Sequence, residues 1–123
     1  SEAASKGQLV LLTVPDDAIA RVCQELSAAG AFAAGAVVAH CCGALGSDAL
    51  APARDRCGCL LGSIHPLQTF PTAASAISHL PGSWCFCEGD SSAVAESSIR
   101  REAASCACSA ASISPLTAAR NAF

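Results

Sequence analysis

The sequence predicts an all-α fold, a small bundle of four to five helices stapled by disulfides. Alternating patterns typical of strands are nearly absent, whereas the 123 residues include 28 Ala and 9 Cys. Leu, Ile, Val and Phe together supply only 26 residues, so the core is thin for this length. Small domains with thin cores commonly depend on cross-links.

The expected organisation is an N-terminal arm at residues 1–14, a helical domain at 15–112 and a C-terminal tail at 113–123. Residues 8–14 are a short apolar run, either a strand or a helix-docking arm, of which we favour the docking arm. The first helix begins at Pro15, with Asp16 and Asp17 complementing the dipole of its first turn, and ends at Gly30.

The remaining elements follow from apolar periodicity and from proline and glycine stops. The segment 32–45 is apolar nearly all round and predicts a central buried helix. The residue before a proline disfavours helix, so the next helix ends at His65-Pro66. We therefore expect helices over 32–45, 53–64, 71–80 and 92–112, with a loop at 83–92.

An internal duplication of a two-helix unit is an open alternative. The windows CGCLLGSIHPLQ and CACSAASISPLT share six positions, and each follows a Thr-x-Pro helix start and a close cysteine pair. The two units would be residues 13–67 and 69–116. Cys23 has no counterpart in the second unit, so it is the expected free or intermolecular thiol.

Cysteine usage favours a secreted, extracellular protein, because reduced cytosolic proteins seldom carry this many. Metal binding is a rival, but CxC spacing is unusual for a lone zinc site, and no metal site is predicted. Cys41 or Cys42 beside His40 is the only local candidate for a Cys-His nucleophile. The disulfide framework would use the CC pair and three CxC pairs, which are Cys41, Cys42, Cys57, Cys59, Cys85, Cys87, Cys106 and Cys108.

The order Cys23, Cys41-Cys42, Cys57-x-Cys59 resembles the plant eight-cysteine fold of the non-specific lipid-transfer and prolamin superfamily. Cys85 and Cys106 could serve as its last two cysteines, although its first has no match here and Cys87 and Cys108 are extra. The resemblance implies a cavity that accommodates lipid. Its candidate lining residues, which are equally core candidates, are Ile19, Val22, Leu26, Val37, Val38, Leu60, Leu61, Ile64 and Ile77.

The predicted function is therefore binding of an apolar small molecule or lipid in an inter-helix cavity. The alternative is an extracellular structural protein that self-associates through the arm or a spare cysteine, with Trp84 and Phe86 as interface candidates. No catalytic motif is present, so no enzyme activity and no cofactor are expected. The net charge of −3 argues against nucleic acid, and the Ala-rich segment 26–47 against a membrane span.

Overall fold

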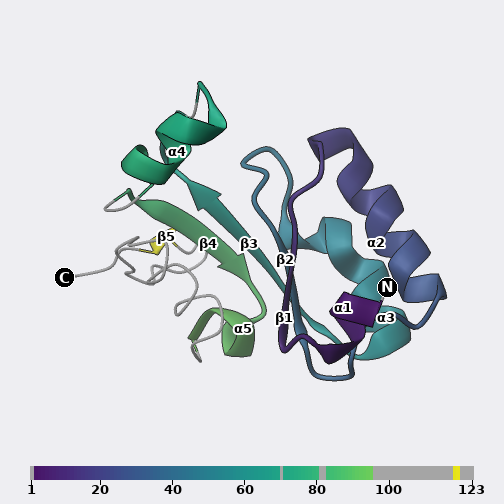
Figure 1. The fold of residues 1–123 in the computed structure, drawn as a ribbon. Coiled ribbons are helices and arrows are strands. Elements are labelled where there is room, and N and C mark those ends of the chain that lie inside the picture. Colours follow the sequence, from purple (N-terminus) through teal and green to yellow (C-terminus); the bar gives the residue numbers. More distant parts are fainter. Residues whose placement is uncertain (1, 70, 81–82, 96–117, 120–123) are drawn as a thin grey trace.

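The computed structural model describes residues 2–69, 71–80, 83–95 and 118–119, and it is an α/β fold (Figure 1). A five-stranded sheet in the order β1-β2-β3-β4-β5 lies at its centre. The prediction of an all-α bundle is wrong. The elements are α1 Glu2–Lys6, β1 Leu9–Leu12, η1 Asp16–Ala18, α2 Ile19–Ala28, β2 Val37–His40, η2 Ser47–Leu50, α3 Ala51–Cys57, β3 Leu60–Pro66, α4 Ala73–His79, β4 Cys85–Gly89, α5 Ser91–Ala95 and β5 Ala118–Ala119.

Strands β1, β2 and β3 are parallel, and β4 and β5 are each antiparallel to the strand before them. The crossovers from β1 to β2 and from β2 to β3 carry α2 and α3, which lie together on one side of the parallel strands (Figure 1). Parallel neighbours need such helical crossovers. Their carboxyl ends consequently lie at one edge of the sheet.

The segment predicted as a buried helix over 32–45 contains β2 instead. All four residues of β2 are buried, because helices and loops cover both faces of this parallel strand. An apolar run buried on two sides shows neither period 2 nor period 3.6, so periodicity cannot separate a strand from a helix there. The predicted docking arm is likewise a strand, β1, paired with β2 from Leu9 to Leu12.

The first predicted helix is confirmed as η1 followed by α2. Gly30, with φ +60°, ends it: the Gly30 amide donates to Ser27 O at 3.1 Å and the Ala31 amide to Leu26 O at 2.9 Å. This double closure is the Schellman arrangement. The helix predicted at 71–80 is confirmed as α4, whose start is capped by the Thr72 hydroxyl, accepting from the Ser75 amide at 3.1 Å.

Two other predicted boundaries are wrong. The helix predicted over 53–64 ends at Cys57, where Gly58 adopts φ +68° and turns the chain into β3. The loop predicted over 83–92 contains β4, in which buried Cys85 and Cys87 alternate with more exposed residues. Of the helix predicted over 92–112, α5 accounts for the beginning, and 96–112 lies outside the described residues.

The core has two parts, one on each face of the sheet. The cluster under α2 and α3 is made of Leu12, Ile19, Cys23, Phe32, Val38, Cys42, Leu50, Ala53, Cys59 and Leu61. The cluster on the opposite face, towards α5, is made of Val37, Ala39, Ile64, Cys85, Cys87 and Ala93. Half of the ten residues in the first cluster are no larger than valine. Because alanine and cysteine side chains are small, the helices can approach the sheet closely.

The predicted disulfide framework is wrong for the described residues. No disulfide joins any two of Cys23, Cys41, Cys42, Cys57, Cys59, Cys85 and Cys87. The reason is the sheet: its two faces receive alternate residues, so the thiols of a CxC pair occupy core positions rather than meeting partners across a helix bundle. Cys106 and Cys108 lie outside the described residues.

Candidate functional site

The carboxyl end of β2, which lies beside that of β3, carries a loop, residues 41–46, that leads into η2. Ligands of open α/β sheets bind outside the carboxyl ends of the parallel strands, because the loops there are free to vary while the strands stay rigid. His40, the last residue of β2, is fully buried at this edge.

His40 fixes the loop from inside. The Cys42 amide donates to His40 Nδ1 at 3.2 Å, and His40 Nε2 lies 3.1 Å from Gly46 O. Since Nδ1 accepts, the neutral ring carries its proton on Nε2 and donates it to Gly46. The imidazole thus satisfies one backbone group at each end of the loop, and its role is structural.

Glu88 of β4 holds the far end of the loop. Its carboxylate accepts from the Ser47 amide through Oε1 and from the Ser47 hydroxyl through Oε2 at 3.0 Å. The Ser47 amide is one of the first donors of η2, which no helical carbonyl can satisfy. A side chain 41 residues further along the chain therefore takes the position of a helix cap.

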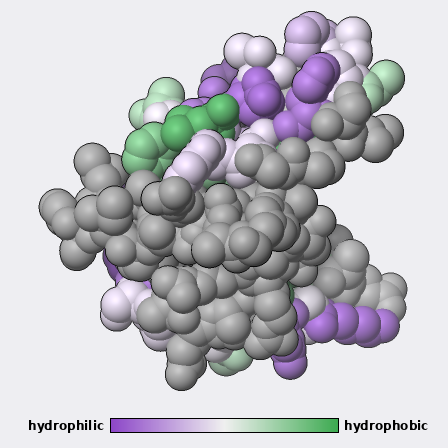
Figure 2. Space-filling view, turned by 90° about the vertical axis from the view of Figure 1, so that its left-hand side faces the viewer, coloured by the Kyte–Doolittle hydropathy of each residue, from purple (hydrophilic) through white to green (hydrophobic). Residues whose placement is uncertain are grey.

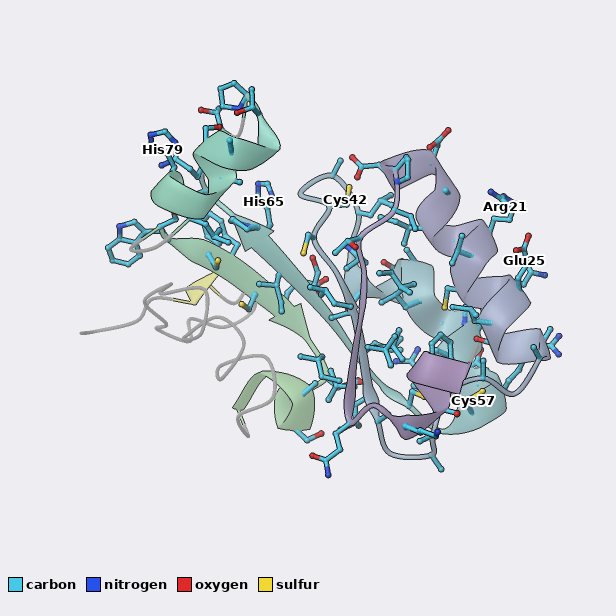
Figure 3. The ribbon with its side chains drawn as sticks, viewed as in Figure 1. Arg21, Glu25, Cys42, Cys57, His65 and His79 are labelled. Atoms are coloured by element: carbon cyan, nitrogen blue, oxygen red, sulfur yellow. The ribbon has the colours of Figure 1, made fainter. Side chains whose placement is uncertain are left out.

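Gly43 lies directly against the ring of His65, which stands near the end of β3 (Figure 3). A Cβ atom added to Gly43 would be 2.5 Å from both Cε1 and Nε2 of His65 and 2.7 Å from Nδ1. Any larger residue would displace the imidazole. Glycine is needed at position 43 for this close approach rather than for its backbone angles, since its φ is not positive.

A hollow of about 420 Å³ opens between the loop and the sheet at this edge. Its floor comes from β3 and β4, where His65 pairs with Phe86 and Ser63 with Glu88. Residues two apart share a face, so these four side chains lie on the α2/α3 face, beyond the end of the helices. The lining is Cys42, Gly43, Ala44, Leu45, Gly46, Ser63, His65, Phe86 and Glu88.

A second hollow, of about 470 Å³, lies at the opposite edge of the sheet. It is formed by residues 6–8 before β1, residues 33–37 before and at the start of β2, Leu60 and Ser92. These are the amino ends of the parallel strands, where α/β sheets do not usually bind ligands. The hollow at the carboxyl edge is therefore the candidate functional site.

A family profile described as a Rossmann-like domain matches residues 1–66, which is more than half of the 123 residues. The chain belongs to this Rossmann-like domain family. The matched part contains all three parallel strands and both crossover helices. Neither a curated protein nor a solved structure matches the chain. The resemblance to the plant lipid-transfer and prolamin superfamily is wrong, since a close cysteine pair and a CxC pair occur here on strands and loops of a mixed sheet.

Rossmann-type folds commonly bind dinucleotides by setting the pyrophosphate on a glycine-rich turn at a helix N-terminus. The described βα turns do not fit that group. The turn after β1 carries Pro15, which has no amide hydrogen, followed by Asp16 and Asp17. The turn after β2 already has the Glu88 carboxylate on the Ser47 amide, and Asp48 follows. Carboxylates at both helix starts oppose a phosphate.

The nine candidate cavity residues do not line one space. Val37 and Ile64 belong to the core cluster on one face and Leu60 packs against it, whereas Ile19, Val38 and Leu61, with Val22 and Leu26 beside them, belong to the other face. Val37 and Leu60 also reach the hollow at the amino edge. Ile77 lies within α4. The structure thus distributes the other eight residues over two core layers, and none of these eight lines the carboxyl-edge hollow.

Cys23, the predicted odd thiol, is fully buried under α2. Its Sγ donates to Leu50 O at 3.6 Å and lies 3.9 Å from Ser27 Oγ. Burial raises the pKa of the Cys23 thiol, against smaller lowering contributions from its hydrogen bonds, and burial followed by the neighbouring thiols raises the pKa of Cys59. Both groups are neutral and poorly nucleophilic near pH 7.

Trp84, directly before β4, and Phe86 within β4 are exposed, by 44% and 43%. Leu67, exposed by 48%, is tied to Trp84 by a backbone hydrogen bond from its amide to Trp84 O at 2.7 Å. On the side of the molecule in Figure 2, an apolar surface adjoins the hydrophilic residues at the top. Phe86 connects these exposed residues to the hollow.

No helix among the described residues combines the length and the apolar composition that a membrane span needs. The same residues also contain no group of three or more His, Cys, Asp or Glu side chains placed to hold a metal ion. His79, in the last turn of α4, is exposed and stands apart from His40 and His65.

From the sequence, only Phe86 and Cys42 among the hollow's residues were assigned a role, and His65 was not predicted to belong to a site. The missed signal was the order of residues around His40. A short apolar run here ends in a polar residue and is followed by Gly43, Gly46 and then Ser47-Asp48. This order is typical of a strand, a loop and the start of a helix. His65 just before Pro66 ends the next strand in the same way.

Proposed function

We propose that this Rossmann-like chain binds a small, mainly apolar organic molecule in the hollow at the carboxyl edge of β2 and β3. The observation that supports it best is the composition of the lining: glycine, alanine, leucine, cysteine and phenylalanine form most of the walls, and Ser63 and His65 project from the floor. Small-molecule sites are typically concave and apolar with a few polar groups.

The size of the hollow supports a small molecule rather than a long lipid chain. At about 420 Å³ it lies at the lower end of the range of ligand pockets. A lipid tunnel was implied only by the lipid-transfer resemblance, which the fold overturns. Secretion and the lack of enzyme activity stay predictions.

The test uses N-phenyl-1-naphthylamine, an uncharged probe whose emission rises in apolar surroundings, with the full chain. We expect saturable binding and a change in the fluorescence of Trp84, the chain's only tryptophan, which lies two residues before Phe86. Phe86→Ala should weaken probe binding severalfold. Leu67→Ala is the matched control, since Leu67 is exposed but does not line the hollow.

The outcome decides clearly. Probe binding that is absent, or that Leu67→Ala weakens as much as Phe86→Ala does, contradicts the proposal. A pattern of the second kind would favour the general exposed surface formed by Leu67, Trp84 and Phe86 over the hollow.

That exposed surface supports a second candidate function, self-association or binding of a partner protein. Three large apolar side chains, each at least 43% exposed, lie at one end of β3 and β4. Aromatic residues of this kind are common anchors of interfaces. Sedimentation equilibrium of the chain and of Trp84→Ala tests it: a monomer in both cases argues against self-association.

A further inference from the structure

We infer that His65 is the recognition residue of the carboxyl-edge hollow, and that the hollow selects planar ligands that carry no negative charge. This inference rests on the proposed function. It concerns which ligands the hollow accepts, whereas the proposed function concerns whether it binds small molecules at all.

The position of His65 is defined by its neighbours. The ring lies against Gly43 on one side, and across the sheet its strand partner is Phe86. His65 is only half-buried, and no hydrogen bond from its ring to another described residue occurs, in contrast to His40, whose two ring nitrogens are both occupied. A half-buried imidazole with free nitrogens on the floor of an apolar hollow can donate to a ligand or accept from it.

The shape of the floor favours a flat ligand. Phe86 is 43% exposed, so part of its ring remains available for contact from the hollow. Opposite it stands the loop with Gly43, Ala44 and Gly46, whose small side chains leave the backbone close to the space. A planar ring could stack on or against Phe86, and a heteroatom at its edge could reach His65.

The charges around the hollow disfavour anions. In the described part of the chain its lining contains no lysine or arginine, but it contains the carboxylate of Glu88. A second carboxylate, that of Asp48, lies beside Gly46, as an added Cβ there would be 2.7 Å from its Oδ1. The described cations are elsewhere: Lys6 lies at the amino edge, Arg21 pairs with Glu25 on α2, Arg56 is in the last turn of α3, and Arg54 faces Asp90, with 3.7 Å between Nη1 and Oδ1. Among the described residues, a bound carboxylate or phosphate would meet repulsion without a compensating cation.

The experiment compares three rings of nearly equal shape: benzamide, benzamidine and benzoate. Binding to the full chain is followed by amide NMR shifts of Gly43 and Gly46, with Trp84 fluorescence as a second measurement. We expect benzamide and benzamidine to bind more tightly than benzoate. Glu88→Gln keeps an acceptor for the Ser47 amide and removes the charge. It should therefore raise the affinity for benzoate, relative to that for benzamide, by about threefold or more.

Variants of His65 and Gly43 test the recognition residue. His65→Phe keeps a planar ring and removes the nitrogens, so benzamide binding should fall by about threefold to tenfold, the worth of one hydrogen bond. His65→Gln, which keeps donor and acceptor, should restore part of it. Gly43→Ala should weaken binding similarly by displacing the ring. Leu67→Ala is the control, because Leu67 is exposed and does not line the hollow.

Each result is decisive for one of the two claims. If none of the three rings nor the naphthylamine probe binds, the proposed function fails. If rings bind but benzoate binds most tightly, or if His65→Phe and Gly43→Ala bind benzamide like Leu67→Ala, the hollow is a site but the inference about His65 and charge is overturned.

Discussion

Gly89→Ala is expected to be among the most damaging single-methyl additions to this fold. Gly89 is the last residue of β4 and pairs with Gly62 of β3. Its φ of +136° is one that side chains rarely adopt, and an added Cβ would be 2.2 Å from Leu61 O and 2.8 Å from the Gly62 Cα. Both obstacles are backbone atoms of a central strand, so no side chain can rotate away to make room.

The magnitude follows from what must move. Backbone strain of this kind costs about 1–3 kcal/mol. Displacing Leu61 also disturbs two hydrogen bonds, from the Asp90 amide to Leu61 O at 2.9 Å and from the Leu61 amide to Asp90 Oδ2 at 2.8 Å. A neutral bond is worth about 1 kcal/mol and one to a charged group somewhat more. The expected loss is about 3–6 kcal/mol, a large part of the stability of an ordinary domain.

Urea unfolding of the full chain under reducing conditions, followed by circular dichroism, measures this loss as a shift of the midpoint at constant slope. Gly35→Ala is the matched control: its φ is +76°, but a Cβ there meets no atom within 4 Å, so only strain of about 1–2 kcal/mol applies. If Gly89→Ala costs no more than Gly35→Ala, the close approach of β3 and β4 is not as the structure shows it.

Three further predictions concern the core and the loop. Leu50 is fully buried under α2, so Leu50→Ala should lower the free energy of unfolding by about 2–5 kcal/mol. Leu45 is 37% exposed, so Leu45→Ala should change this free energy by less than about 1 kcal/mol. Equal losses in urea unfolding would contradict this prediction. His40→Ala leaves the Cys42 amide and Gly46 O without their partner, so unfolding should become easier by about 2–4 kcal/mol and binding in the hollow should weaken; unchanged amide shifts of Gly43 and Gly46 would argue against the imidazole as the loop's support. The pKa values of Cys23 and Cys59 are raised in the folded state, so the unfolded thiols ionise first as the pH rises. The free energy of unfolding should therefore be constant below the ordinary thiol pKa of about 8.5 and fall above it. This decline between about pH 8 and pH 10 should be smaller in Cys23→Ala, and an unchanged slope would refute the assignment.

Local signals in the sequence predicted part of the fold, whereas the rest depends on long-range strand pairing and was not predicted. The start of the first helix at Pro15 and its end at Gly30, and the whole of α4, were predictable because caps and helix stops act within a few residues. The strands were missed because β2 is buried on both faces and β1 and β2 are only four residues long. Their identity depends on pairing with one another, which no local window contains.

The cysteines were misread for a related reason. A count of nine in 123 residues indicates cross-links when the fold is unknown, since cross-linked small domains are the commonest setting for such a count. In this sheet Cys23, Cys42 and Cys59 fill the space between α2, α3 and the strands, as small apolar residues would. The same cysteine content that predicted disulfides therefore belongs to a core in which small side chains let the helices pack closely on short strands.

The two histidines at the carboxyl edge show why the candidate site could not be read from residue type. His40 and His65 each stand at or next to the end of a neighbouring parallel strand, and their sequence settings are similar. The loop 41–46 folds back over His40, burying it and occupying both nitrogens, while the same loop approaches His65 only through a glycine. The path of one six-residue loop thus assigns a structural role to the first ring and leaves the second facing the hollow. Changing Gly43 should alter the second ring alone, which makes it the most direct probe of the site.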